Sequence, residues 1–486
     1  MLDSMSDVVV WERSFSEVKV KRDPEELLAF VAKHLKTALG DSIEGVLKVS
    51  YGGAPGLMIV GRYGDSRYEV LVVVPDSSPR AKIVVSGAYA AERAERIATY
   101  VENLIYTFAV GGDKGIFYFV LIPGLSLVPP KAESRLFKAL QGMFLGNMVF
   151  IFAVSILISY AVYVALGPYL TPIALVLMQI PLMLLAPYIM AGILGDWRLD
   201  ELHRFVYLVG VKVPIESYKE LLSRIFMPKR YEIKRRMYEA VAGREEVDRE
   251  YINALLASYG LKPGEYELEV RKIDIYGLVE RVTAKYGLKT PSIYIANIII
   301  PNAGATGLYP LTAAIFITTG LLTRLSEKEV EAVLGHELSH LKNWDVLTLF
   351  LLGAAEYLTR VYVLTTFRPF FPPGFAFIYL FFSLTVFFFL AKIIETRADI
   401  EAAVRLNLPL SLSSALEKLG LTRIAFEKRP GGRLMYWLLW KPHPPTLFRI
   451  ETLKRIAERG CAVGSPWIAA IKFCVEDFLR ALTSGE

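Results

Sequence analysis

Cysteine is scarce in this chain, and its scarcity narrows the kinds of site to expect. The 486 residues include two cysteines, Cys461 and Cys474, which do not form a C-x-x-C pair. Their spacing indicates neither a disulfide framework nor a thiolate metal site, and two unpaired thiols fit a reducing cytosol. Dense runs of lysine and arginine are also missing, at a net charge of +6, so no nucleic-acid partner is expected. The first residues lack the basic and then apolar stretch of a cleavable signal, and none is expected.

Charged residues are absent from one long stretch, which points to the membrane. None stands between Lys138 and Asp196, in a chain that is 53% hydrophobic. The stretch is too long for one span of about 20 residues. It fits two spans, predicted near 143–166 and 173–194, with a turn at Gly167 and Pro168. Two further spans are predicted near 346–366 and 374–391, so we expect four in all.

The third predicted span carries two charges, Glu356 and Arg360. They stand at i and i+4 on one helix face, where they can form a structural ion pair. Charged groups in a span usually face a bundle interior or a wet cavity, so a place on a substrate path is the alternative.

Basic residues flank the first pair of spans on one side only: Lys131, Arg135 and Lys138 precede it, and Arg198 and Arg204 follow it. By the positive-inside rule, the N-terminal and central regions are cytosolic. The fourth span then returns to the cytosol, and we expect a multi-pass protein of the cell membrane.

The stretch from Ser326 to His340 carries the chemistry. Ser326 with Glu329 three places later forms a capping box, so a helix is predicted to begin there. On that helix His336 and His340 lie one turn apart on one face, where two imidazole nitrogens can reach one metal ion. Glu337 can reach a water at that metal, and three protein ligands with one open position define catalytic zinc. The alternative is a polar helix with two exposed histidines.

A third ligand is predicted directly after the fourth span, where Glu395 and Asp399 share a helix face. One carboxylate can bind the metal while the other accepts the free N–H of a ligating histidine. The alternative is a juxtamembrane cluster of charges. His340 lies six residues before the third span and Glu395 a few after the fourth. Both therefore lie within roughly 10 Å of the membrane surface, on its cytosolic side.

Together these motifs resemble the HtpX family of membrane zinc endopeptidases, relatives of the CAAX prenyl endopeptidases. The segment 301–307 is similar to the family's P-N-A-F-A-T-G, with Gly304 in place of the usual aromatic residue. That departure puts in doubt a substrate pocket formed by the aromatic ring. His443-Pro444-Pro445 with Arg449-Ile450 resembles the family's H-P-x-x-x-R-I signature, and the resemblance covers roughly residues 140–455.

The resemblance implies a ligand set and a substrate site. It implies one Zn2+ per chain, with Glu395 as the third ligand and Asp399 as its supporting partner. Asn302, Ala303 and the strand near 314–319 would bind substrate as an edge strand, a common recognition mode. His443 and Arg449 would hold the site or the developing oxyanion, and the alternative for His443-Pro444 is a structural turn.

The expected fold is an α-helical membrane protein with four spans, a gluzincin-like α+β zinc protease domain and a small N-terminal α+β domain. Five regions are expected: a cytosolic α+β domain at 1–130, a transmembrane hairpin at 140–195, the cytosolic protease region at 197–345, a second hairpin at 346–392, and a helical C-terminal part at 393–486 that carries the third ligand. In the first region a helix is predicted from Asp23 to Leu39 and strands near 47–51, 57–62, 68–75, 81–86 and 115–123. The segment 197–289 is expected to be helical.

The expected reaction is hydrolysis of peptide bonds in membrane or misfolded polypeptides. Glu337 would take the proton of the attacking water and pass it to the leaving amine. A CAAX-type prenyl-protein endopeptidase is one rival, although it would be expected to have more spans. A site-two intramembrane protease is another, but its L-D-G setting is absent. A non-hydrolytic metal-binding scaffold or transporter is the rival from a different class.

Overall fold

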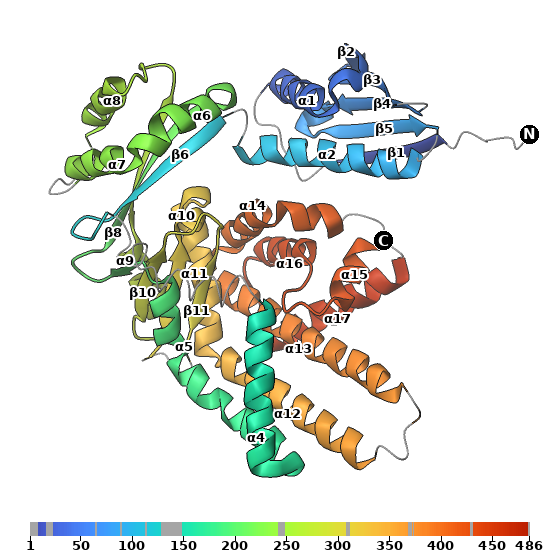
Figure 1. The fold of residues 1–486 in the computed structure, drawn as a ribbon, viewed down its shortest axis with the longest axis vertical. Coiled ribbons are helices and arrows are strands. Elements are labelled where there is room, and N and C mark those ends of the chain that lie inside the picture. Colours follow the sequence, from blue (N-terminus) through green and yellow to red (C-terminus); the bar gives the residue numbers. More distant parts are fainter. Residues whose placement is uncertain are drawn as a thin grey trace, which may run out of the picture. The chain divides into compact units, whose positions relative to one another are not determined.

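The fold is that of a computed structural model, which describes residues 8–15, 23–63, 66–87, 90–111, 114–127, 148–241, 248–307, 312–367, 372, 374–427 and 431–484. The chain divides into two compact units. The first comprises Met1–Phe117, Val211–Arg230 and Leu256–Leu268, and the second comprises the remaining segments. Each unit is described by itself below (Figure 1).

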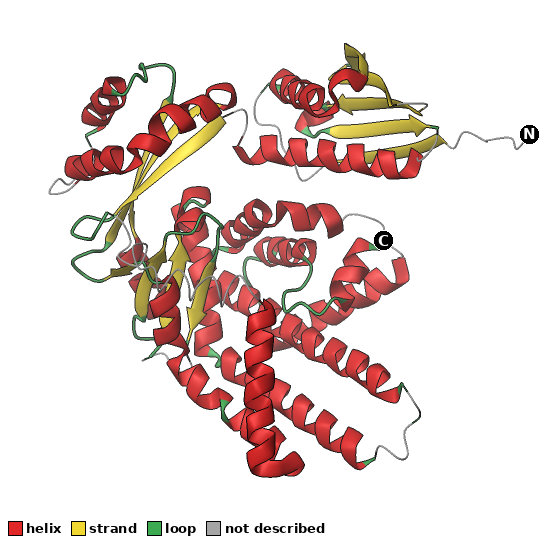
Figure 2. Cartoon of the chain, viewed as in Figure 1, coloured by secondary structure: helices red, strands yellow, loops and turns green. Residues whose placement is uncertain are grey.

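The first unit contains an antiparallel sheet with the strand order β1-β5-β4-β3-β2. Its strands are β1 (Val8–Ser14), β2 (Ile43–Tyr51), β3 (Ala54–Tyr63), β4 (Ser66–Val73) and β5 (Arg80–Ser86). Helices α1 (Pro24–Leu39) and α2 (Ala90–Gly111) pack on the sheet (Figure 2). Asp23 caps α1 through the N–H of Glu25 (3.0 Å), as the sequence predicts. The alternating pattern of β4 buries every second side chain, which is why this sheet could be predicted. Strand β1 was not predicted.

A second sheet has the strand order β6-β8-β9. The strands are β6 (Lys114–Leu121), β8 (Phe205–Pro214) and β9 (Glu267–Asp274). The predicted strand at 115–123 therefore pairs outside the N-terminal sheet. The helical interpretation of 197–289 is wrong for β8 and β9. A short apolar run such as 205–213 has no period that separates strand from helix. The helices of this segment are α6 (Ile215–Leu221), α7 (Met227–Val241), α8 (Arg249–Ser258) and α9 (Ile275–Tyr286).

The sheet beside the predicted site has the order β11-β12-β10-β7. Its strands are β7 (Trp197–Leu199), β10 (Ser292–Ala296), β11 (Ala303–Thr306) and β12 (Ala314–Thr318). Strand β12 lies between two neighbours and is buried along its length. The expectation that 314–319 offers an exposed edge is therefore wrong, and the edge strand is β11.

Helices form the rest of the second unit. They are α10 (Thr319–Arg324), α11 (Glu327–Lys342), α12 (Asp345–Thr366), α13 (Phe375–Leu406), α14 (Pro409–Glu427), α15 (Gly432–Leu438), α16 (Thr446–Glu458) and α17 (Pro466–Ser484). Two helices run between the predicted spans and the predicted site. Only two residues separate α11 from α12, and α13 continues unbroken from the predicted fourth span through Glu395 and Asp399.

Three stretches are long and apolar enough to cross a membrane: Ser155–Leu194, Asp345–Thr366 and Phe375–Leu406, among the described residues. The first has 40 residues and comprises most of α4 (Met148–Leu177) and all of α5 (Gln179–Leu194). The chain turns back at Gly167, whose φ of 72° suits glycine (Figure 1). The turn was predicted at this residue. The basic residues at 131–138 and most of the segment between the third and fourth predicted spans lie outside the described residues.

The two charges of α12 pair with each other, as predicted. Arg360 Nε donates to Glu356 Oε1 at 2.9 Å, and Ser383 Oγ of α13 donates to the same oxygen at 3.0 Å.

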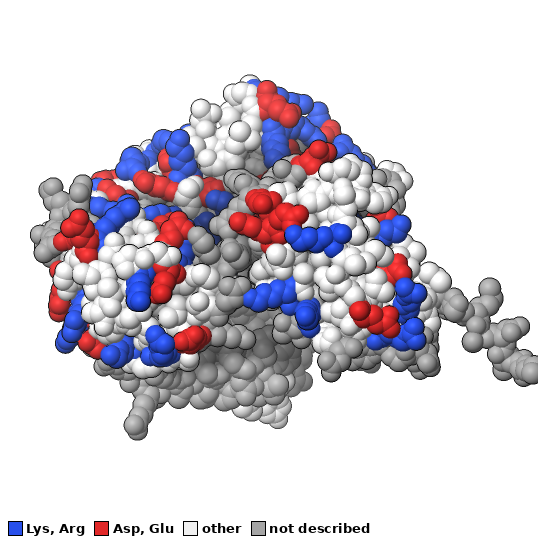
Figure 3. Space-filling model, turned by 90° about the horizontal axis from the view of Figure 1, so that it is seen from above, with Lys and Arg blue, Asp and Glu red and all other residues white. Residues whose placement is uncertain are grey.

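On the face that Figure 3 shows, acidic and basic side chains are interspersed.

Candidate metal centre

Helix α11 brings two imidazoles together. Its start is fixed by the predicted capping box, in which the Ser326 N–H donates to Glu329 Oε2 at 2.7 Å. Ten residues into the helix, His336 and His340 stand one turn apart with their ring centroids separated by 4.7 Å. Their Nε2 atoms are 3.1 Å from each other.

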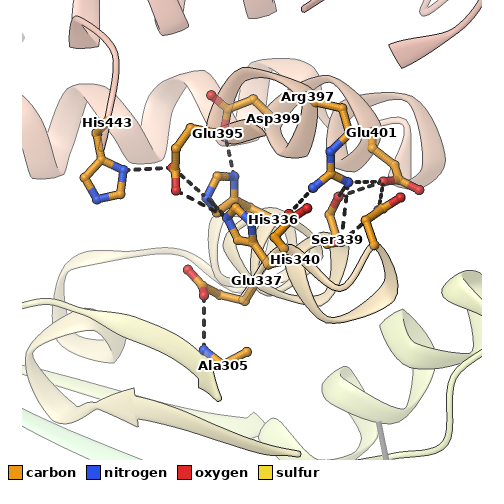
Figure 4. Close-up of polar contacts among 12 residues, drawn as sticks. Ala305, His336, Glu337, Ser339, His340, Glu395, Arg397, Asp399, Glu401 and His443 are labelled. Atoms are coloured by element: carbon orange, nitrogen blue, oxygen red, sulfur yellow. Dashed lines mark hydrogen bonds and ion pairs between the residues drawn. The ribbon is translucent and has the colours of Figure 1, made fainter. Parts of the chain in front are cut away.

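Glu395 of α13 closes the cluster from the opposite side (Figure 4). Its carboxylate oxygens lie 3.5 Å from His336 Nε2 and 3.5 Å from His340 Nε2. Within the described part of the chain, these three residues are the one group of His, Cys, Asp and Glu side chains close enough to hold a metal ion. The fold thus brings together the side chains of His336 and Glu395, which are 59 positions apart in the sequence.

Two more carboxylates fix the orientation of the imidazoles. His340 Nδ1 lies 2.7 Å from Asp345 Oδ2. His336 Nδ1 lies 2.9 Å from Asp399 Oδ1, an ion-pair contact rather than a well-aligned hydrogen bond. Because a carboxylate favours a proton on the nitrogen that faces it, both Nε2 lone pairs are left to face each other and Glu395. That arrangement is repulsive unless a cation lies between them.

The spacing of the three donors fits zinc. Ligands about 2.0–2.1 Å from a tetrahedral ion are separated by about 3.3 Å. The observed separations of 3.1, 3.5 and 3.5 Å bracket that value. Two nitrogens and one carboxylate oxygen also form a donor set typical of a catalytic zinc site with an open fourth position.

The electrostatics of the site favour positive charge. Burial lowers the pKa of His336, but the neighbouring Asp399 and Glu395 carboxylates raise it more, to about 10. The same two anions would stabilise a metal ion in place of the proton. His336 and Asp399 are both buried, so solvent screens this attraction little.

A buried network supports the carboxylates that hold the histidines. Arg449 donates to Asp399 through Nε and Nη2, at 2.7 and 2.8 Å. Arg397 pairs with Asp345 and also donates to Glu401 Oε2 at 2.7 Å.

The sequence did not predict the parts played by Asp345, Arg397 and Glu401. Asp345 stands directly before the predicted third span, and Arg397 and Glu401 follow the predicted fourth span. The available signal was the position of Asp345, about one helical turn beyond His340.

Glu337 points toward the edge strand. Its Oε2 accepts the N–H of Ala305 in β11 at 3.1 Å (Figure 4). A cavity of about 190 Å³ lies beside it, and its lining includes the predicted substrate residues Asn302 and Ala303 together with His336, Glu337, His443 and Arg449. The main chain of Asn302 is fixed by Thr318, whose Oγ1 accepts the Asn302 N–H at 2.8 Å.

The two candidates for stabilising an oxyanion differ in their surroundings. His443 is half-exposed, and its Nδ1 lies 2.7 Å from Glu395 Oε2. Arg449 is nearly buried, and two of its nitrogens are directed at Asp399. Of the two, His443 has the side chain that can approach a substrate, while Arg449 supports the carboxylate behind His336.

Known proteins are similar to this chain in sequence. Residues 270–457 match Peptidase family M48. A "Protease HtpX homolog" from Acidiphilium cryptum (strain JF-5) is 31% identical over 233 residues, which cover 42% of this chain and 80% of the relative. Another from Thermodesulfovibrio yellowstonii is 29% identical over 233 residues, with 42% and 82% covered.

Two other likenesses are more limited. A "Protease HtpX homolog" from Campylobacter concisus (strain 13826) is 50% identical over 74 residues, and the match covers 15% of this chain and 26% of the relative. The structure titled "Crystal Structure of S. mikatae Ste24p" aligns over 75% of this chain and 86% of that chain, at 15% identity and a TM-score of 0.28. A score that low supports no conclusion about the fold. The match of residues 270–457 and the likeness to the Acidiphilium relative establish the family: this chain is an HtpX-like member of peptidase family M48.

Proposed function

We propose that this protein is a zinc endopeptidase that cleaves membrane-associated or misfolded polypeptides at the cytosolic face of the membrane. The observation that carries the proposal is the convergence of His336 Nε2, His340 Nε2 and the Glu395 carboxylate on one point, with Glu337 beside it. His336, His340 and Glu395 would hold the ion. A bound zinc ion supplies Lewis acidity, which activates water and polarises a carbonyl group.

Glu337 supplies the proton transfers in this proposal. It takes a proton from the attacking water and delivers it to the amine that leaves. The Ala305 N–H holds one of its oxygens at 3.1 Å. The carboxylate is thereby kept between the two histidines and β11, where a scissile bond paired with the strand would lie.

The edge of β11 is the proposed binding place for the substrate backbone. In an antiparallel pair, alternate residues direct their N–H and C=O groups to the partner strand and away from it. Asn302 C=O accepts the Thr318 N–H at 3.0 Å, on the side of β12. Ala303 and Ala305 therefore direct their backbone groups to the open edge, where Glu337 already accepts the Ala305 N–H. An extended peptide that pairs there would be held along the side of Glu337.

The placement of the site at the membrane rests on helix continuity. Only Asn343 and Trp344 separate α11 from α12, and Glu395 lies on the same helix as the apolar run that ends at Leu390. We propose four crossings, because Ser155–Leu194 turns back at Gly167. The charge asymmetry of the sequence then orients the site to the cytosol.

The test is metal analysis and casein degradation with the purified full chain. Wild type should carry about one zinc, and a chelator should remove zinc and activity together. Glu337→Gln should keep the zinc and lose a factor of about 10²–10⁴ in rate, the usual contribution of a general base. Glu395→Ala should lose the zinc.

Glu327→Gln is the matched control, because Glu327 is an exposed residue in the first turn of the same helix. It should retain both metal and activity. Zinc binding without cleavage by wild type would leave a metal-binding membrane protein with no hydrolytic function. Full activity in Glu337→Gln would remove Glu337 from its assigned role.

A further inference from the structure

Helix α17 exposes a stripe of large apolar side chains. The stripe consists of Ile468, Ile471, Val475, Leu479 and Leu482. These residues recur every three or four positions and so share one helix face. Ile468 is 70% exposed and Leu482 is 55% exposed, so most of their apolar surface has no partner within the described part of the chain. Contiguous apolar surface of this kind marks a site of interaction with another protein or a membrane.

The other faces of α17 have different surroundings. One face is buried and fixed: Asp477 pairs with Arg433 and accepts the indole N–H of Trp437 at 2.9 Å. A third face is polar and exposed, with an ion pair between Lys472 and Glu476. The helix is therefore held in one orientation, with an apolar and a polar strip side by side on its outside. That division is typical of helices that lie in a membrane interface.

Contacts with α13 set the depth of α17. Cys474 Sγ lies 3.2 Å from Thr396 Oγ1, and the rings of Phe478 and Phe389 are 5.6 Å apart. The exposed apolar surface of α13 ends at Leu390, and the helix is mostly buried in protein from Ala391 onward. The second half of α17 therefore runs past the level at which the apolar belt of α13 ends.

The spacing of these two contacts fits an oblique crossing of α13 by α17. The two contacts are about 10 Å apart along α13 and about 6 Å apart along α17. An oblique helix at the end of an apolar belt can direct one long side to lipid and the other to water.

The turn after α15 lies beside a part of α13 that is further inside the predicted span than the part that α17 contacts. The indole N–H of Trp440 donates to Thr385 Oγ1 at 3.2 Å, and its ring lies 6.1 Å from that of Phe381. Thr385 is about 10 Å further along the predicted span than Lys392, the first charged residue after it. Trp440 is nevertheless 43% exposed, so its outer surface faces whatever surrounds α13 at that depth.

We propose that the C-terminal end of the apolar stripe of α17, with Leu479 and Leu482, and the side chain of Trp440 dock into the cytosolic boundary of the bilayer as a peripheral anchor beside the spans. The occupant is lipid, because the second half of α17, from Phe478 onward, reaches the depth of the exposed belt of α13. Tryptophan is also the residue type that membrane interfaces favour. The proposal rests on the membrane placement of α13 in the proposed function and is independent of peptidase activity.

The test measures the collision accessibility of nitroxide probes on the full chain in lipid vesicles. All probes are introduced into a Cys461→Ser chain, in which the buried Cys474 is left in place. The same chain without an added cysteine, treated with the nitroxide reagent, measures the signal from unspecific labelling. Probes are placed singly by Leu479→Cys, Leu482→Cys and Trp440→Cys. At these positions, accessibility to oxygen, which concentrates in lipid, should exceed accessibility to a water-soluble nickel complex several-fold. Glu476→Cys, on the polar face of the same helix, is the matched control and should show the reverse.

Phe382→Cys, on the exposed surface of α13, separates the two possible failures. A Phe382 probe in water would overturn the membrane placement of α13 itself. A Phe382 probe in lipid with Leu479 and Leu482 open to nickel would overturn only the anchor. Low accessibility to both reagents, with spin–spin broadening, would show that a second copy covers the stripe and would also overturn the proposal.

Discussion

Replacing Asp345 with asparagine changes one charge in the support of the proposed metal centre and leaves its three proposed ligands in place. Asp345 Oδ2 lies 2.7 Å from His340 Nδ1 and also pairs with Arg397, and both charged groups are buried. An asparagine oxygen can still accept the Nδ1–H bond, but without the negative charge that strengthens it. His340 therefore becomes a weaker and less firmly oriented ligand.

The magnitude follows from two separate effects. Loss of a group that orients a ligating histidine typically lowers metal affinity by about 10–100-fold, which corresponds to about 1.4–2.8 kcal/mol. Weakening a buried ion pair also costs stability. Removing one partner of a buried ion pair and leaving the other charge unpaired costs about 3–5 kcal/mol. A smaller loss is expected here because Arg397 keeps a second charged partner, Glu401. Arg397 keeps its hydrogen bonds to Glu401 and Ser339, each 2.7 Å long.

The assay is competition for zinc with a fluorescent chelator, with thermal unfolding measured on the same protein in detergent. Asp477→Asn is the matched control, because Asp477 is also a buried carboxylate paired with an arginine and contacts no metal ligand. It should lower the melting temperature and leave zinc affinity unchanged. Equal zinc affinity in Asp345→Asn and wild type would refute the reasoning and leave Asp345 a structural role alone.

Two other substitutions test the edge strand and the capping box. Gly304→Phe should change the unfolding free energy by no more than about 0.5 kcal/mol, because Gly304 lies in the edge strand and the Cβ from which the ring would extend meets no atom within 4 Å; thermal unfolding checks this. The same variant should alter which peptides are cleaved, since Gly304 lies beside residues that line the cavity, and an unchanged peptide profile would contradict that role. Lys418, Ser414 and the Ser326 N–H hold the pKa of Glu329 below its usual 4.5 although burial opposes them. Wild type should therefore be more stable than Glu329→Gln above pH 4.5, and the difference should close as the pH falls through the lowered pKa, as thermal unfolding against pH would show. A gap that persists in acid would mean that the contribution of Glu329 does not depend on its charge.

The predictions that agree with the structure rest on local rules. The capping box at Ser326 and the cap at Asp23 depend on residues three or fewer positions apart, so the sequence alone contains their geometry. The pairing of Glu356 with Arg360 and the chain reversal at Gly167 are equally local. The contact of Glu395 with the two histidines is not local, because more than 50 residues separate them in the sequence. It could be predicted because two spans that cross one membrane must end at the same level on each side of it.

The features that sequence reasoning missed depend on tertiary contacts. Strand β8 is buried on both faces, so its apolar residues show no alternation, and the charged helices around it suggested a helical segment. Which strand lies at an edge is decided by the order of strands in the sheet, and 314–318 became interior only because β11 folds against it. The contact of Asp345 with His340 similarly requires the tight connection in which Trp344 adopts a positive φ of 58°.

The buried ion pairs of the site are costly to form, and their position suggests why they are present. Arg397 joins α13 to Asp345 at the start of α12, so it ties together the two helices that continue from the metal centre into the spans. Further along, α12 and α13 leave a cavity of about 520 Å³ between them, lined mostly by apolar residues together with Glu356 and Ser383. About 30 Å of α13 separates its far end from Glu395, so a tilt of about 2° about that end would move the ligand by about 1 Å. Donor atoms that must lie within a few tenths of an ångström of their place around zinc could not tolerate that movement. Fixing the two helices to each other beside the proposed metal site, where Arg397 meets Asp345, would keep the spacing of the proposed ligands independent of the looser packing of the apolar parts of α12 and α13.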